Sequence, residues 1–129
     1  MLRGILQRCS RRVPEELVNK LRQGKTLVHP KPNNSLKWEV ERMGDVVVLE
    51  NYDPERVASF NGPHNNNPVT RILLEKCGWL RPKQYKVTSA DVSYQSGHML
   101  NRGLIVAREK IGKIKAAQTV RSFLEGLNA

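Results

Sequence analysis

The chain has 129 residues, which suits a single domain with a modest hydrophobic core. Lys and Arg number 22 against 12 Asp and Glu, so the formal net charge is +10, and 39% of the residues are hydrophobic. This composition excludes full disorder, and no apolar run approaches the roughly 18 residues of a membrane-spanning helix. The two cysteines, Cys9 and Cys77, lie far apart, which argues against a disulfide framework and favours a reducing compartment.

The basic residues gather at the two ends of the chain. Residues 1–32 carry a net charge of +6 from eight bases and two acids, and residues 81–129 carry +6 from nine bases and three acids. Residues 33–80 carry −2 from five bases and seven acids. This distribution favours a nucleic-acid partner, because each Lys or Arg that faces a phosphate releases condensed counterions. The alternative is a well-solvated surface.

Residues 1–12, MLRGILQRCSRR, contain no acid and place Leu2, Ile5 and Leu6 on one face if they are helical. The arginines of this segment are Arg3, Arg8, Arg11 and Arg12. A basic, acid-free, amphipathic start is typical of a mitochondrial transit peptide. The alternative is a basic arm that becomes ordered on RNA, and both roles are compatible. We therefore expect an N-terminal arm over 1–12 and a single domain over 13–129.

Two elements are expected next. Pro14 near the start and Gly24 at the end predict a short helix over 13–23. The following residues, 24–36, read as an extended linker, because His29-Pro30-Lys31-Pro32 disfavours helical backbone before each proline.

Residues 36–51 predict a β-hairpin. Trp38 and Val40 alternate with polar residues, Gly44-Asp45 supplies a turn, and the apolar run 46–49 forms the second strand. Asp53-Pro54 then predicts a helical turn or two as far as Phe60.

A further helix is expected over 68–77. Asn67-Pro68 resembles a helix start, and Gly78 resembles a helix stop, with Trp79 folding back on Leu74. Cys77 would then be a small buried hydrophobic residue.

The last third predicts strands over 85–94 and 104–107 and a helix over 113–127. The apolar stripe of that helix is Ile114, Ala117, Val120, Leu124 and Leu127. Together these elements predict an α+β fold, in which short antiparallel strands pack against two to three helices.

The basic tract near the C-terminus is the strongest candidate for a binding site. Its residues are Arg102, Arg108, Lys110, Lys113, Lys115 and Arg121. Gly103 and Gly112 would allow the backbone to approach a phosphate closely. With the arginines of the arm, these cations are predicted to contact RNA phosphates, which positions a protein without reading sequence. The alternative is a solvated surface in which long side chains cover apolar neighbours.

Other kinds of site find little support. Trp38, Tyr85 and Tyr94 lie near cations and offer faces for base stacking, but core positions explain them better. His29, His64 and His98 have no His or Cys at metal-ligand spacing, so neither a metal site nor a cofactor is expected. No nucleophile, base or glycine-rich phosphate loop forms a catalytic set, and we expect no enzyme activity.

Three features resemble mitochondrial ribosomal proteins as a class. They are the leader-like residues 1–12, the extended segment HPKPNN, and the basic tract from Arg102 to Lys115. The likeness is one of overall design. It implies a structural role in the mitochondrial matrix, with ribosomal RNA and neighbouring ribosomal proteins as partners, and it assigns no chemistry to any residue.

The main alternative is an accessory subunit of a mitochondrial respiratory or ATP synthase complex. Such a subunit would share the leader and the basic charge, but it would need two ends of +6 only if they faced an anionic lipid such as cardiolipin. A more distant alternative, a small organellar enzyme or RNA-processing factor, would need catalytic residues that this sequence does not offer.

Overall fold

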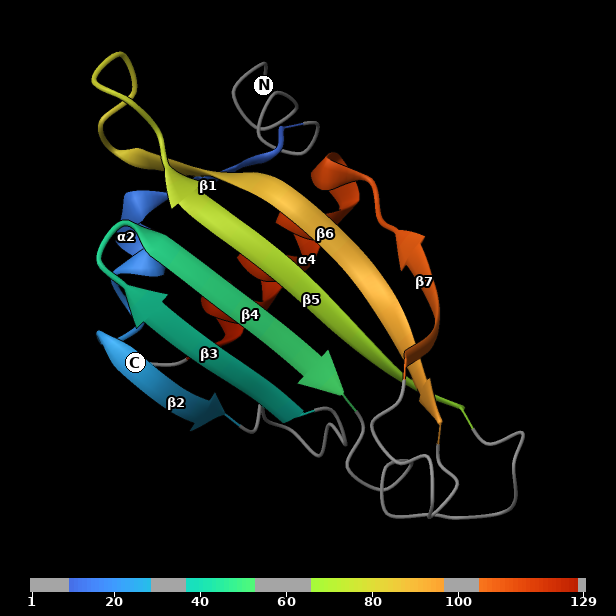
Figure 1. The fold of residues 1–129 in the computed structure, drawn as a ribbon. Helices are drawn as coiled ribbons and strands as arrows, with labels where there is room; N and C mark the ends of the chain where they lie inside the picture. The colour runs from blue at the N-terminus through green and yellow to red at the C-terminus, as the bar shows by residue number, and fades with distance from the viewer. Residues whose placement is uncertain (1–9, 29–36, 53–65, 97–104, 128–129) are drawn as a thin grey trace.

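A seven-stranded antiparallel sheet forms most of the described structure, and a 14-residue helix covers one of its faces. The structure is a computed structural model that describes residues 10–28, 37–52, 66–96 and 105–127. Its elements are β1 (Arg12–Pro14), α2 (Glu15–Val18), β2 (Gly24–Val28), β3 (Lys37–Met43), β4 (Val46–Tyr52), β5 (Asn66–Lys76), β6 (Gln84–Ser96), β7 (Ile105–Lys110) and α4 (Lys113–Gly126). Figure 1 shows the sheet in front and α4 running diagonally behind it.

Strand β6 joins the two ends of the chain in one sheet. Strands β2 to β6 form a meander in which each strand pairs with the next. The other edge of β6 is shared by two strands, since β1 pairs with residues 84–86 and β7 pairs with residues 91–95. Because a strand has only two edges, β1 and β7 must follow one another along the same edge of β6.

The hairpin of β3 and β4 shows how the sequence pattern builds the sheet. Trp38 and Val40 point into the core, while Glu39 between them stays partly exposed, as expected for side chains that alternate across a strand. Gly44 in the turn has a φ of 61°, a left-handed conformation that glycine adopts without strain. The turn is also held by Gln23, whose side-chain oxygen accepts a 2.9 Å hydrogen bond from the Gly44 amide.

The hydrophobic core lies between the sheet and α4. Small side chains on the helix, Ala116 and Ala117, allow it to approach the strands closely, and Val120 and Leu124 are completely buried there. Phe123 stacks on Trp38 of β3 with ring centroids 4.1 Å apart. The expected exposure of one residue was wrong, because Ile114, assigned to the apolar stripe, is 47% exposed. The helix therefore buries the stripe from its second turn onward.

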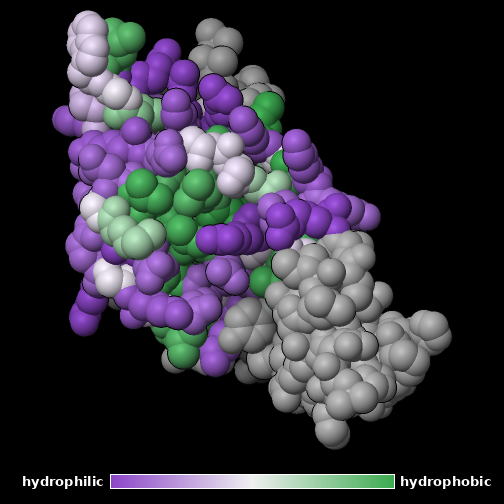
Figure 2. Space-filling view, in the orientation of Figure 1, coloured by the Kyte–Doolittle hydropathy of each residue, from purple (hydrophilic) through white to green (hydrophobic). Residues whose placement is uncertain are grey.

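Among the residues that the structure describes, no helix lies on the opposite face of the sheet. Val46, Val48 and Leu73 point outward near its centre and remain only partly buried. Figure 2 shows an apolar area over the middle of this face, enclosed by hydrophilic side chains.

The prediction of a helix over 68–77 was wrong, because this segment lies in β5. Ile72 and Leu74 point into the core and are 1% and 0% exposed, whereas Leu73 between them faces outward. A run of three apolar residues fits both a helical stripe and a buried strand. Pairing with β4 on one side and β6 on the other decides in favour of the strand.

Two predictions near the N-terminus need correction as well. The helix expected over 13–23 is limited to Glu15–Val18, because Val13 belongs to β1 and pairs with Tyr85. The first part of the linker expected over 24–36 forms the edge strand β2. The predicted hairpin, the strand over 85–94 and the C-terminal helix are confirmed, while the turn expected over 53–60 lies outside the described residues. The α+β expectation holds only broadly, since the sheet dominates.

Candidate nucleic-acid interface

Cations from distant parts of the sequence meet along the β6 edge that β1 and β7 share. We call this surface the basic edge; its residues are Arg11, Arg12, Lys86, Arg108, Lys110, Lys113 and Lys115. Arg12 lies opposite Lys86 in the pairing of β1 with β6, and the β7 residues Arg108 and Lys110 lie opposite Ser93 and Asp91. The edge thus combines cations of the predicted N-terminal arm with cations of the C-terminal tract.

The pleat of the sheet turns several of these cations away from the core. Val13 and Tyr85 are buried under α4, so their neighbours Arg12 and Lys86 point to the face opposite this helix. Ala90 is likewise buried, which places its neighbour Asp91, and with it Lys110, on that face.

The last part of the basic edge surrounds the junction of β7 and α4. We call its residues, Arg108, Lys110, Lys113 and Lys115, the β7–α4 cluster, and all of them are exposed. The junction is fixed on β6 because the Ile111 amide donates a 3.0 Å hydrogen bond to the Ala90 carbonyl. The four cations therefore project from a backbone that is anchored at both elements.

Among the described residues, no cation of the basic edge takes part in an ion pair. The three pairs present join Lys25 to Glu39, Arg71 to Glu50 and Lys76 to Glu15, and none includes a cation of the basic edge. Glu75 and Asp91 face Lys86 and Lys110 in register without forming an ion pair. At the other end of the sheet, by contrast, Lys25 of β2 is paired with Glu39 of β3. The hydrogen bond to Glu39 raises the pKa of Lys25.

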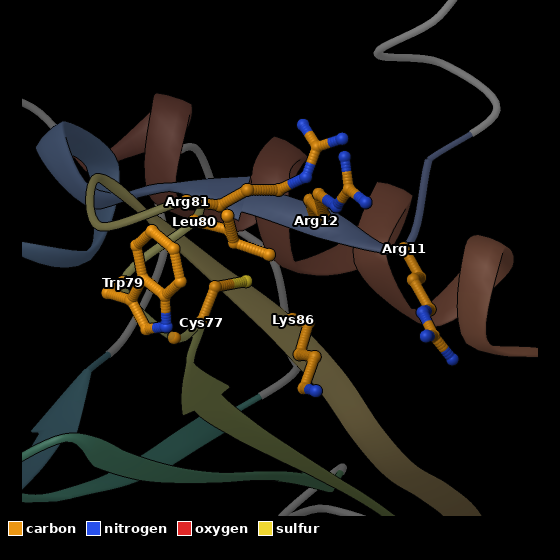
Figure 3. A pocket seen from close by; sticks show the side chains of 8 residues that line it. Arg11, Arg12, Cys77, Trp79, Leu80, Arg81 and Lys86 are labelled. Carbon is orange, nitrogen blue, oxygen red and sulfur yellow. The ribbon is translucent and has the colours of Figure 1, made fainter.

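A pocket opens where the β5–β6 turn approaches β1. It has a volume of about 270 Å³. We call it the turn pocket; it is lined by Arg11, Arg12, Cys77, Gly78, Trp79, Leu80, Arg81 and Lys86. Figure 3 shows the Arg81 side chain extending along the pocket toward Arg12, with the Cys77 sulfur directed into the space between Leu80 and Lys86. Half of the lining residues are thus cations, and no acid is among them.

The turn that carries Trp79 is held by backbone hydrogen bonds. The Arg81 amide donates to the Gly78 carbonyl at 2.9 Å, and the Cys77 amide donates to the Gln84 carbonyl at 2.8 Å. Trp79 is 85% exposed and Leu80 is 77% exposed. The predicted contact of Trp79 with Leu74 was wrong, because β5 directs Leu74 into the core before the chain turns. Cys77, expected to be buried, is only half-buried at the pocket wall.

Arg121, predicted to contact RNA, is instead used inside the fold. Its Nη1 atom donates hydrogen bonds to the carbonyl oxygens of Ser10 at 3.0 Å and Arg12 at 2.6 Å, and the residue is 8% exposed. Burial lowers the pKa of Arg121, opposed by the charge of Glu125. Its assignment to the interface is therefore corrected: Arg121 anchors β1 to α4.

Arg42 plays a comparable internal part on the other side of the core. Its Nη1 atom donates to the carbonyls of Leu21 at 2.9 Å and Val18 at 3.3 Å, and its Nη2 atom donates to the Asn19 side chain at 2.9 Å. These bonds satisfy backbone groups at the end of the short helix α2. Arg42 therefore contributes to the fold and not to the surface charge of the basic edge.

Of the predicted RNA-contacting residues, the structure brings Arg11 and Arg12 to the same sheet edge as the β7–α4 cluster. Arg3, Arg8 and Arg102 lie outside the described residues. From the sequence, Trp79 was given a core contact, and Arg81 and Lys86 were not singled out, although the run WLRPK from 79 to 83 combines a proline with two cations. The core positions expected for Trp38 and Tyr85 are confirmed by exposures of 4% and 1%.

Within the described ranges, no helix is long and apolar enough to cross a membrane, and no group of three His, Cys, Asp or Glu side chains is placed to hold a metal ion. Comparison of the chain with protein-family models, with curated proteins and with solved structures finds no match.

Proposed function

We propose that this protein is a structural RNA-binding component of the mitochondrial ribosome, located in the matrix, where it contacts ribosomal RNA phosphates and neighbouring ribosomal proteins. In this role it catalyses no reaction. The observation that supports the proposal is the meeting of the Arg11–Arg12 pair with the β7–α4 cluster on one edge of β6, without ion-pair partners among the described residues.

An edge rich in cations costs electrostatic free energy when no anion faces it. Like charges held along one anchored edge repel one another, and the repulsion is relieved when phosphates replace the surrounding counterions. Positions 108 and 110 lie roughly 6.8 Å apart along β7, given about 3.4 Å per residue in an antiparallel strand. Contacts of this kind fix the position of a protein on RNA and carry no base information.

Salt titration of binding to structured RNA tests the proposal. The test variant replaces all four residues of the β7–α4 cluster by Gln. The control variant replaces Arg22, Lys25 and Lys37 by Gln; these residues lie in or next to β2 and β3, at the other end of the sheet. Each lost phosphate contact should lower the slope of log affinity against log salt by about one unit, so the cluster variant should lose about four. The control should lose less than about one.

The outcomes separate the alternatives. Equal slopes in the wild type and the cluster variant would remove the β7–α4 cluster from the interface. Absence of RNA affinity in the wild type, together with binding to cardiolipin vesicles, would favour a subunit of a membrane complex. Sedimentation of the tagged protein with ribosomal particles, and its release by RNase, would test the assembly itself.

A further inference from the structure

The turn pocket offers a combination of surfaces that phosphate contact alone does not require. Trp79 presents most of its indole to solvent on a turn that backbone hydrogen bonds hold in place. A largely exposed Trp beside an exposed Leu80 is a costly arrangement, because large apolar side chains gain free energy from burial. An exposed aromatic group on a fixed turn suggests that a ligand covers it.

The positive charges of the pocket restrict the chemical class of that ligand. Arg12 reaches the pocket from β1, Arg11 from the residue before that strand, Arg81 from the turn itself and Lys86 from β6. None of the four takes part in an ion pair within the described part of the chain. A purely apolar ligand would leave these cations desolvated and unpaired, and a bare anion would leave the indole uncovered. A ligand with both a flat apolar face and a negative charge satisfies both groups.

We infer that the turn pocket binds one unpaired nucleotide of the RNA, with its base stacked on Trp79 and its phosphate held by Arg12 and Arg81. This inference rests on the proposed function and deepens it, since it states which form of RNA the protein selects. Bases in a duplex are hidden in the stack, whereas bases of loops and bulges are free to stack on aromatic side chains. The pocket volume of about 270 Å³ is close to the lower end of the roughly 300–1,000 Å³ found for small-molecule sites, so the pocket has no room for more than one nucleotide.

The two surfaces then have separate roles. The β7–α4 cluster contacts phosphates of any RNA, whether paired or unpaired, and the turn pocket requires an extruded base. Because Arg11, Arg12 and Lys86 belong to both the basic edge and the turn pocket, a bulged nucleotide in the pocket would leave the adjoining backbone beside the rest of the edge.

The experiment compares two RNA hairpins that differ by one bulged nucleotide and whose strands are joined by a hexaethylene glycol linker in place of a nucleotide loop, so that the bulge is the one unpaired nucleotide in either RNA. Trp79→Leu removes the aromatic face, Trp79→Phe preserves one, and Leu27→Ala on β2 serves as a control that removes a different exposed apolar side chain. Base–aromatic stacking predicts that Trp79→Leu weakens binding to the bulged hairpin by about 5- to 150-fold, while Trp79→Phe retains most of the affinity. Binding to the fully paired hairpin should change less than about twofold in every variant.

Fluorescence gives a second reading on the same proteins. The chain has two tryptophans, and Trp38 is 4% exposed and stacked on Phe123, so quenching by the bulged hairpin should come from Trp79 and vanish in Trp79→Leu. In a Cys9→Ser background, the bulged hairpin should also slow alkylation of Cys77 by iodoacetamide, because Cys77 lines the same pocket.

The results distinguish failure of this inference from failure of the proposed function. If the wild type binds neither hairpin, the proposed function fails. If it binds both hairpins, and Trp79→Leu alters neither affinity nor quenching, the inference is overturned while the proposed function stands. If adenosine monophosphate quenched the Trp79 fluorescence with the same affinity as the bulged hairpin, the turn pocket would be a site for free nucleotides. If Trp79→Leu lost binding to a neighbouring protein but kept its affinity for both hairpins, the turn pocket would be a site for a protein partner. Either of these last results would also overturn the inference.

Discussion

Arg121→Met should destabilise the protein but leave the salt dependence of its RNA affinity unchanged. Methionine keeps an unbranched chain of similar reach in the core, but it cannot donate hydrogen bonds to the carbonyls of Ser10 and Arg12. A hydrogen bond from a charged donor contributes about 1.5–3 kcal/mol, so the two together represent about 3–6 kcal/mol. Release of the buried charge, whose desolvation lowers the pKa of Arg121, offsets part of this. We therefore expect a loss of about 2–4 kcal/mol in the free energy of unfolding.

The assays are urea denaturation, thermal unfolding and hydrogen exchange. For a chain of this size, a loss of about 2–4 kcal/mol corresponds to a decrease in Tm of roughly 8–16 °C. Exchange should rise most at Val13, because β1 loses its anchor on α4. Lys115→Met is the matched control, since it removes an exposed cation from the same helix and should change stability by less than about 0.5 kcal/mol. A negligible loss of stability in Arg121→Met, accompanied by a salt slope lower by one unit, would refute the reasoning and return Arg121 to the RNA interface.

Three further substitutions test the fold. Trp38→Ala removes a buried ring and its stack on Phe123, so the free energy of unfolding should fall by about 3–5 kcal/mol in urea titrations; an unchanged midpoint would contradict this core. Gly44→Ala forces a side chain into left-handed backbone and should cost about 1–2 kcal/mol by thermal unfolding, whereas Gly78→Ala, which has open space and no left-handed φ, should cost less than about 0.5; equal costs would contradict the turn geometry. Lys20→Met removes two hydrogen bonds to carbonyls at the end of α4 and should cost about 1 kcal/mol, with faster hydrogen exchange in the last turn of that helix; unaltered exchange would count against the contact.

The elements that could be predicted from the sequence are those whose pattern is decided locally. The hairpin over 37–52 has an alternating first strand, a turn glycine and an apolar second strand, and the C-terminal helix has apolar residues at steps of three and four. In β5 the local signals were misleading, because Asn67-Pro68 and Gly78 resemble helix boundaries and Ile72-Leu73-Leu74 fits either period. The neighbouring strands, which are remote in sequence, decide the conformation there.

The candidate site, too, could be predicted only in part from the sequence. The excess of cations at the chain ends was visible in the sequence, but their meeting on β6 depends on the pairing of residues 12–14 with 84–86. The two arginines that serve the interior, Arg42 and Arg121, look like surface cations until their carbonyl partners are known. The predicted contact of Trp79 with Leu74 assumed a helix over 68–77. Because that segment is a strand, the exposure of Trp79 became evident only from the structure.

The position of β1 has a consequence for the order in which the molecule folds. Strands β2 to β6 pair with their neighbours in sequence, whereas β1 waits for residues 84–86 and is held by Arg121 from 109 and 111 positions away. Closing such long loops is slow compared with forming local turns. We expect the meander to form first and the two chain ends to dock last, during synthesis as well as in refolding. A nascent chain that has not yet released its C-terminal helix would then carry most of the cations of the basic edge, but without the arrangement that makes them a surface.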